Sequence, residues 1–146
     1  MTTATRTSAP RECSVAAALD VIGEKWSLLV VRELFLGARK FNDIAANTGA
    51  PRDVLTARLR RLEDLGVIER RLYSQRPARY IYVLTDAGKD LRPVMMTLKQ
   101  WGDTHVMGRP MPPVYEHSCG GVFEPRIACA ECGEPLEPRS LTRIDA

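Results

Sequence analysis

The C-terminal part of the chain carries the side chains best suited to metal chemistry. Two thiols are spaced as Cys129-Ala-Glu-Cys132, directly before Gly133, and His117 and Cys119 lie a short distance upstream. A Cys-x-x-Cys-Gly turn lets two thiolates reach one ion, and histidine or further thiolate ligands complete the tetrahedral set that zinc prefers. We therefore expect a structural zinc site formed by His117, Cys119, Cys129 and Cys132.

Other chemistries stay open for this segment. Cys129 and Cys132 could form a redox-active dithiol, or the thiols could lie idle in a loosely ordered tail. A bound ion would explain how so short and polar a segment folds at all. The run Arg109-Pro-Met-Pro-Pro113 is typical of a stiff linker. These features predict a linker over residues 109–116 and a tail over residues 117–146.

Catalysis is not indicated by the sequence. The chain has only two histidines, His105 and His117, and it has no serine, histidine and carboxylate in a recognisable arrangement. Gly23, Gly37, Gly49 and Gly66 stand singly at the ends of predicted elements, and the sequence has no glycine-rich loop of the kind that cradles phosphate. We expect a protein that is not an enzyme.

Length and composition fit one domain with an appendage. A chain of 146 residues that is 45% hydrophobic can bury a modest core, and proteins of this size often complete that core by dimerising. No apolar run approaches the length of a bilayer span, and residues 1–12, which we expect to form a flexible arm, contain no apolar segment suited to secretion. We expect a cytoplasmic protein with mostly reduced thiols and no membrane partner.

A cationic helix is predicted over residues 51–65. Pro51 suits its first position, where the missing N–H costs nothing. Leu55, Leu59 and Leu62 recur at spacings of four and three, so they stack on one face that we expect to be buried. The remaining surface then carries arginines, which can fork onto guanine in a major groove. The outward residues that we expect to contact DNA are Arg52, Asp53, Thr56, Ala57, Arg60 and Arg61.

The neighbouring segments complete a DNA-binding motif. Residues 41–49 are predicted to form a short helix that ends in glycine, and two helices joined in this way form a helix-turn-helix. Residues 67–72 and 79–84 alternate as two paired strands, with Ser74-Gln-Arg-Pro-Ala78 as the tip of the hairpin. We predict an α+β, mostly α fold of the winged helix-turn-helix type that grips a DNA duplex. The predicted wing carries Arg70, Arg71, Arg76 and Arg79, positions from which guanidinium groups can reach phosphates or a minor groove. Its expected DNA contacts are Gln75, Arg76 and Arg79.

The distribution of charge agrees with this location. Residues 52–79 contain eight arginines and four acids, whereas the whole chain carries a net charge of only +3 and has a sequence pI near 8.8. From residue 116 onward the balance reverses, with six acids and three arginines. The positive field is therefore concentrated in the predicted helix and wing.

Three further helices are predicted outside this motif. Residues 15–36 give two helices interrupted around Gly23, with Trp26 expected in the core. Thr85 is a good N-cap for a long helix over residues 86–107. The apolar stripe of that helix is long for a small domain, so we expect it to dimerise with its two-fold mate and to pack on the N-terminal helix. Packing within one chain is the alternative.

Four stretches then follow one another in a specific order. They are residues 13–34, which include Val-Ile-Gly-Glu-Lys-Trp-Ser, then Phe41-Asn-Asp-Ile44, residues 55–70, and Arg79-Tyr-Ile-Tyr-Val-Leu-Thr-Asp-Ala-Gly88. The series resembles the HxlR family of winged helix-turn-helix transcription regulators, which is related to the MarR type. The resemblance implies a bacterial homodimeric regulator that binds a pseudo-palindromic operator. It also implies a winged domain over residues 13–108, with the recognition helix at 51–65 and the wing at 74–79.

Cys13 is a candidate for redox sensing. It precedes the first predicted helix, where exposed N–H groups and Arg11 would favour its thiolate. In several members of the family that the chain resembles, a cysteine at the matching place senses oxidants or electrophiles, so the resemblance implies the same role for Cys13. A small packed residue near a dimer interface is the alternative.

A mechanism follows from these expectations. Two protomers would place their recognition helices in successive major grooves, about 34 to 36 Å apart. An oxidant or small-molecule effector would shift the separation of the two helices and so break their register with DNA. A function of a different class is a protein-interaction module, in which the winged domain docks a partner protein and a zinc-stabilised tail anchors it.

Overall fold

The computed structural model describes residues 11–144, so most of the predicted N-terminal arm lies outside the described residues. The chain forms two compact units that divide between Lys89 and Asp90. The sequence placed this division later, after residue 108. The difference arises because the long helix predicted over residues 86–107 is interrupted.

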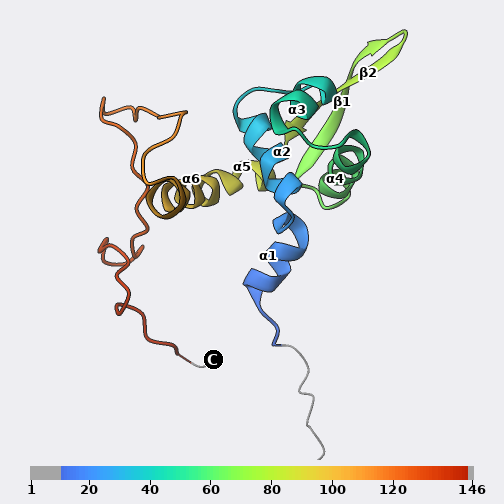
Figure 1. The fold of residues 1–146 in the computed structure, drawn as a ribbon. Coiled ribbons are helices and arrows are strands. Elements are labelled where there is room, and N and C mark those ends of the chain that lie inside the picture. The colour runs from blue at the N-terminus through green and yellow to red at the C-terminus, as the bar shows by residue number, and fades with distance from the viewer. Residues whose placement is uncertain (1–10, 145–146) are drawn as a thin grey trace, which may run out of the picture. The chain divides into compact units, whose positions relative to one another are not determined.

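The first unit has the predicted winged helix-turn-helix fold (Figure 1). Helices α3 and α4 form the helix-turn-helix, and strands β1 and β2 form a two-stranded antiparallel wing. The elements of this unit are α1 (Ser14–Ile22), α2 (Lys25–Phe35), α3 (Phe41–Thr48), α4 (Arg52–Asp64), β1 (Ile68–Gln75), β2 (Ala78–Leu84) and α5 (Asp86–Lys89).

The core of the first unit lies between α2, α3, α4 and the start of the wing. The spacing of the leucines in α4 has the predicted effect, because Leu55, Leu59 and Leu62 are all buried. Trp26 is only half-buried, and the ammonium group of Lys25 lies 4.6 Å from the centroid of its ring, so the prediction of a core tryptophan is wrong. The other buried apolar side chains are Val30, Val31, Leu34, Ile44, Ala50, Val67 and Ile68.

The turn between α3 and α4 is fixed by three consecutive residues. Gly49 has a φ of +71°, which few residues with a side chain adopt, and Ala50 is buried. Pro51 is extended, with a ψ of 140°, so it serves as the N-cap and α4 begins at Arg52, one residue later than predicted. The Pro51 carbonyl still accepts the N–H of Leu55 at 2.8 Å, so the first helical hydrogen bond is made.

The wing is longer and tighter than predicted. Ser74 pairs with Arg79 and Gln75 with Ala78, so only Arg76 and Pro77 remain as the turn. The predicted five-residue tip is therefore mostly strand, because pairing continues beyond an irregularity between Leu72 and Ser74.

One backbone hydrogen bond joins the wing to the loop between α2 and α3, and a second continues the strand pairing by one residue at the base of the wing. The N–H of Tyr82 donates to the carbonyl of Arg39 at 2.8 Å, and the N–H of Thr85 donates to the carbonyl of Val67 at 3.1 Å. The Thr85 hydroxyl also accepts the N–H of Gly88 at 3.2 Å, which confirms the predicted N-cap.

The second unit consists of a helix and an irregular tail. Helix α6 (Leu91–Gly102) continues into a π-helical turn, η1 (Asp103–Met107). Pro93 explains the break that separates α5 from α6, because proline has no N–H to donate to residue 89 and is best tolerated in the first turn of a helix. No residue of α6 is buried within its own chain. Within residues 11–144, no helix is both long and apolar enough to cross a membrane.

We expect the replacement Leu59→Ala to lower the free energy of unfolding by about 2–5 kcal/mol, because it leaves a cavity inside the core. The control Leu65→Ala alters a leucine at the end of α4 that is 39% exposed, and it should cost about 0.5 kcal/mol. Urea unfolding followed by circular dichroism measures both values. Equal losses in the two variants would contradict the assigned faces of α4.

Candidate nucleic-acid interface

The outer face of α4 presents nearly all of the residues that were predicted to contact DNA. Arg52, Asp53, Ala57, Arg60 and Arg61 are exposed, and Thr56 is half-buried. The hydroxyl of Thr56 donates to the Arg52 carbonyl at 2.8 Å, so its hydrogen is used within the helix while its oxygen can still accept a bond. At the tip of the wing, Gln75, Arg76 and Arg79 are exposed.

Arg52 differs from the other arginines of α4 because it is held by α3. Its guanidinium carbon lies 4.7 Å from the ring centroid of Phe41, and its Nη2 donates to Oδ1 of Asn42 at 3.1 Å. A stacked and hydrogen-bonded guanidinium has few rotamers left to lose on binding. Arg52 is therefore positioned at the beginning of the helix before any ligand arrives.

Three arginines of this region are neutralised by acids of the same chain. Arg58 pairs with Glu24 at 2.6 Å, Arg70 lies 3.8 Å from Glu63, and Arg71 pairs with Glu69. The sequence had assigned Arg70 and Arg71 to the cationic wing together with Arg76 and Arg79. Their ion pairs reduce the charge that these two residues offer to a polyanion.

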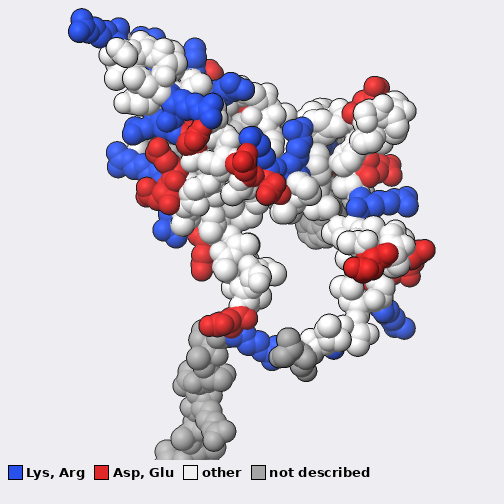
Figure 2. All heavy atoms as spheres, turned by 180° about the vertical axis from the view of Figure 1, so that it is seen from behind, with Lys and Arg blue, Asp and Glu red and all other residues white. Residues whose placement is uncertain are grey.

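Four arginines keep their charge available. None of the ion pairs within residues 11–144 includes Arg60, Arg61, Arg76 or Arg79. Figure 2 shows lysine and arginine side chains spread over the wing and the adjoining edge of the first unit, with acidic side chains among them. We call these four arginines the free arginines, and the surface of α4 and the wing on which they are exposed the cationic surface. Its contact with DNA stays a prediction.

The base of the wing and α4 lie within electrostatic reach of each other. Burial raises the pKa of the Tyr82 hydroxyl, while the charges of Arg70 and Arg60 act in the opposite direction and that of Glu63 adds to the increase. Tyr82 therefore stays neutral near pH 7, and the positive charge of Arg60 on α4 acts directly on a residue of β2.

A buried carboxylate of α2 holds α3, the first helix of the helix-turn-helix. Glu33 of α2 is only 3% exposed, and its oxygens accept hydrogen bonds from Arg32 at 2.9 Å and from the amide of Asn47 at 2.8 Å. The bond to Asn47, an exposed residue of α3, joins α2 to α3. Sequence reasoning missed this contact, although a charged residue inside an apolar helical stripe was the signal that could have revealed it.

The predicted thiol sites occupy separate places. Cys13 is exposed at the N-cap of α1, and its carbonyl accepts the N–H of Ala17 at 3.0 Å. Cys129 and Cys132 share one turn of the tail, and the pKa of Cys129 is lowered by the backbone N–H groups of Cys132 and Glu131 and then by the Cys132 side chain.

The predicted zinc ligands are arranged in the structure as two pairs. Cys129 and Cys132 form one pair, and the N–H of Cys119 donates to Nδ1 of His117 at 3.3 Å in the other. Within residues 11–144, no three His, Cys, Asp or Glu side chains are gathered closely enough to hold a metal ion. The zinc site therefore stays a prediction.

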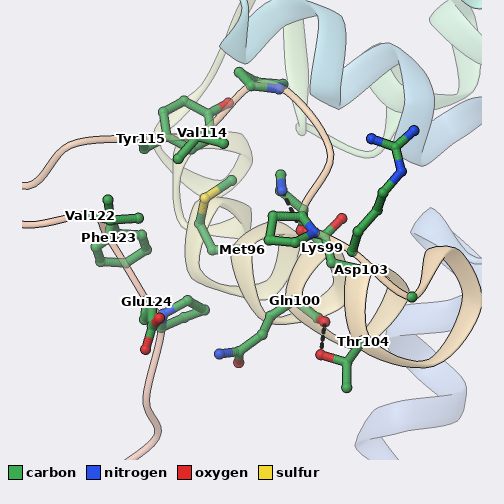
Figure 3. A pocket seen from close by; sticks show the side chains of 15 residues that line it. Met96, Lys99, Gln100, Asp103, Thr104, Val114, Tyr115, Val122, Phe123 and Glu124 are labelled. Carbon is green, nitrogen blue, oxygen red and sulfur yellow. Dashed lines mark hydrogen bonds and ion pairs between the residues drawn. The ribbon is translucent and has the colours of Figure 1, made fainter.

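The second unit contains a pocket of about 430 Å³ between the end of α6 and the tail (Figure 3). Met96, Tyr115 and Phe123 contribute apolar walls. Lys99 and Asp103 form an ion pair of 2.5 Å at its edge, and the N–H of Met111 donates to Asp103 at 3.2 Å. The hydrogen bond from Lys99 is the main reason why the pKa of Asp103 is lowered.

Proteins with similar sequences and folds are regulators. The model of the HxlR-like helix-turn-helix family matches residues 21–110. An uncharacterized HTH-type transcriptional regulator of Mycobacterium tuberculosis is 44% identical over 131 residues, which cover 88% of this chain and 83% of that protein. The crystal structure of PA1607, a candidate transcription factor, has a TM-score of 0.74 at 30% identity and covers 92% of this chain and 94% of its own. The redox regulator HypR in its oxidized form has a TM-score of 0.59 at 34% identity and covers 64% of this chain and 97% of its own.

The geometry of the wing predicts the effect of removing one free arginine. Arg76→Ala should weaken binding to unrelated duplexes by similar factors and reduce the slope of log affinity against log salt by about 1, because a cation at the wing tip meets phosphate. The control Lys89→Ala removes one exposed cation of α5, outside the cationic surface, and should leave both quantities unchanged. Fluorescence anisotropy with labelled duplexes measures them. An equal effect of the two replacements would contradict the assignment.

Proposed function

This chain is a transcriptional regulator of the HxlR-like helix-turn-helix family, and from that membership we propose that it acts as a homodimer on a pseudo-palindromic operator. The observation that carries the proposal is the set of free arginines on α4 and the wing, which have no acidic partner in the part of the chain that the structure describes. A surface that keeps such charges exposed is suited to a polyanion.

The two elements of the surface have different roles in this proposal. Helix α4 enters the major groove, where Arg60 and Arg61 read base edges or clamp the neighbouring phosphates. The wing lies against the backbone, where Arg76 and Arg79 bind phosphates or reach an adjacent minor groove. Arg52, already stacked on Phe41, fixes the beginning of α4 relative to α3.

The second protomer is recruited through α6. Val94, Leu98 and Trp101 of this helix are 46%, 47% and 59% exposed within one chain, and a soluble regulator gains from covering such a stripe. A second copy of the same helix is the occupant that we propose. The resulting two-fold symmetry places two α4 helices in successive major grooves, about 34 to 36 Å apart.

Nuclease footprinting on the DNA directly upstream of the gene that encodes this chain tests this arrangement. We expect two chains per duplex and two protected half-sites whose centres lie one helical turn apart, since the protein symmetry is imposed on the operator. A complex of one chain with one protected half-site would contradict the homodimer.

We expect Arg60→Ala to relax the preference for operator over unrelated DNA by about 1 to 3 kcal/mol, because a guanidinium that pairs a base edge carries sequence information. Competition binding measures this preference. Arg76→Ala is the matched comparison, since it should weaken operator and unrelated DNA alike. If Arg60→Ala also weakened both equally, Arg60 would be a phosphate contact.

We further propose that Cys13 responds to oxidants. HypR is a redox regulator that this chain is similar to, and Cys13 is exposed at the start of α1. A peroxide would transfer one oxygen atom to the Cys13 thiolate, giving a sulfenic acid, and the released hydroxide would take up a proton to become water. Oxidation at this place would change the packing of α1 and so the separation of the two α4 helices.

The sensing role predicts a specific loss. Cys13→Ser should leave operator affinity intact and abolish the change that peroxide or a quinone causes in the unmodified protein, because only the reacting sulfur is removed. The double variant Cys129→Ser/Cys132→Ser is the matched control and should still respond. Gel-shift titrations with and without oxidant measure both, and an unchanged response of Cys13→Ser would exclude the role.

The pocket beside α6 is a second place at which a signal could act. Its volume of about 430 Å³ lies within the range of small-molecule sites. The formal charges of its lining balance, because Lys99 pairs with Asp103 and the lining contains one further cation, Arg109, and one further acid, Glu124. The pocket is therefore suited to an uncharged and largely apolar effector. Such a ligand would touch α6 directly and could bias the geometry of the dimer.

A further inference from the structure

The tail contains two similar turns, each closed by a backbone hydrogen bond and flanked by an isolated β-bridge. In the first, the N–H of His117 donates to the carbonyl of Gly121 at 2.8 Å, and an isolated bridge joins Glu116 to Val122. In the second, the N–H of Cys129 donates to the carbonyl of Glu134 at 2.9 Å, and a bridge joins Ala128 to Pro135. Two similar hairpins, the second with a loop one residue longer, thus follow each other within about twenty residues of chain.

Each hairpin presents a pair of metal-binding side chains at its tip. Cys119 directly precedes Gly120, whose φ is +87°, and Cys132 directly precedes Gly133, whose φ is +73°. In both hairpins the N–H of this glycine closes the turn by donating at 2.8 Å to the carbonyl of the first donor residue, His117 or Cys129. A closed turn of this kind brings two donor side chains within reach of one ion.

The tail also lacks a source of folding free energy in its own packing. Between residues 112 and 144 no side chain is buried, and only Tyr115 and Pro125 are half-buried. All three of its cysteines are exposed as free thiols. A segment of this size without a core usually depends on a metal, a disulfide or a partner for its fold.

We propose that the two hairpins bind one zinc ion per chain through His117, Cys119, Cys129 and Cys132. This site lies outside the DNA-binding surface and does not depend on the proposed operator. Three thiolates and one neutral imidazole form a soft tetrahedral set, which selects zinc over magnesium or calcium. Binding would release the three thiol protons, and the charge of the site would then be −1.

The ion has a structural task in this proposal. Within residues 11–144 the four donors are not gathered into one cluster. Residues 124–127 between the hairpins have no regular secondary structure, so we expect the two hairpins to approach each other when one ion binds both pairs of donors. The first hairpin also supplies Val122 and Phe123 to the pocket beside α6, so zinc would steady one wall of that pocket.

Metal analysis of the full chain tests the proposal. Protein purified under reductant without added metal should contain about one zinc per chain, and Cys129→Ser/Cys132→Ser should contain less than about a tenth of that amount. The matched control Cys13→Ser removes the one cysteine outside the tail and should keep its zinc. Unmodified protein that contains less than a tenth of an equivalent and takes up no added Zn²⁺ would overturn the site.

Thiol reactivity gives a second readout that does not depend on how much zinc the protein retains during purification. A chromogenic disulfide reagent should titrate one thiol, Cys13, in the zinc-loaded chain and all four after a chelator is added, because ligated thiolates are protected. Trypsin should then cleave after Arg126 and Arg139 faster than before chelation, while residues 13–89 stay intact. Four reactive thiols before chelation, in protein to which Zn²⁺ has been added, would contradict the zinc site.

Discussion

The burial of one face of α4 is the constraint on which the rest of the first unit depends. Leu55, Leu59 and Leu62 are at most 1% exposed, and a straight helix with that face inward has only one way to direct its other residues. Arg60 and Arg61 point to solvent for this reason and not because of any contact of their own. The turn before α4 adds direction, since Gly49 and Pro51 set the angle at which the helix leaves α3.

The wing and the tail both bury few apolar side chains, and they are stabilised in different ways. Backbone hydrogen bonds from Tyr82 to Arg39 and from Thr85 to Val67 stabilise the base of the wing, so its outer half can remain exposed and cationic. The tail has no buried side chain after residue 111 in the part that the structure describes, and its hairpins end in thiols and a histidine. A ligated ion would do for the tail what these backbone bonds do for the wing.

The sequence predicted the fold well where one local rule decides the outcome. The leucine spacing gave the buried face of α4, glycine gave the end of α3, and Thr85 gave an N-cap. It failed where a distant or competing group decides. Pro93 broke a helix whose apolar pattern continued, and Trp26 is only half-buried beside Lys25. The acids that neutralise Arg70 and Arg71 could be identified only in three dimensions. The buried Glu33 belongs to the same class, because its partner Asn47 lies on another helix.

The central claim is tested most directly by the salt dependence of binding to a DNA duplex taken from upstream of the gene that encodes this chain. Four free arginines per protomer and two protomers per site predict that log affinity falls with log salt at a slope between about −4 and −7, the steeper value if all eight cations displace counterions. Sedimentation of the same samples should give two chains per duplex. A chain that stays monomeric and binds no duplex even in dilute buffer would contradict the account.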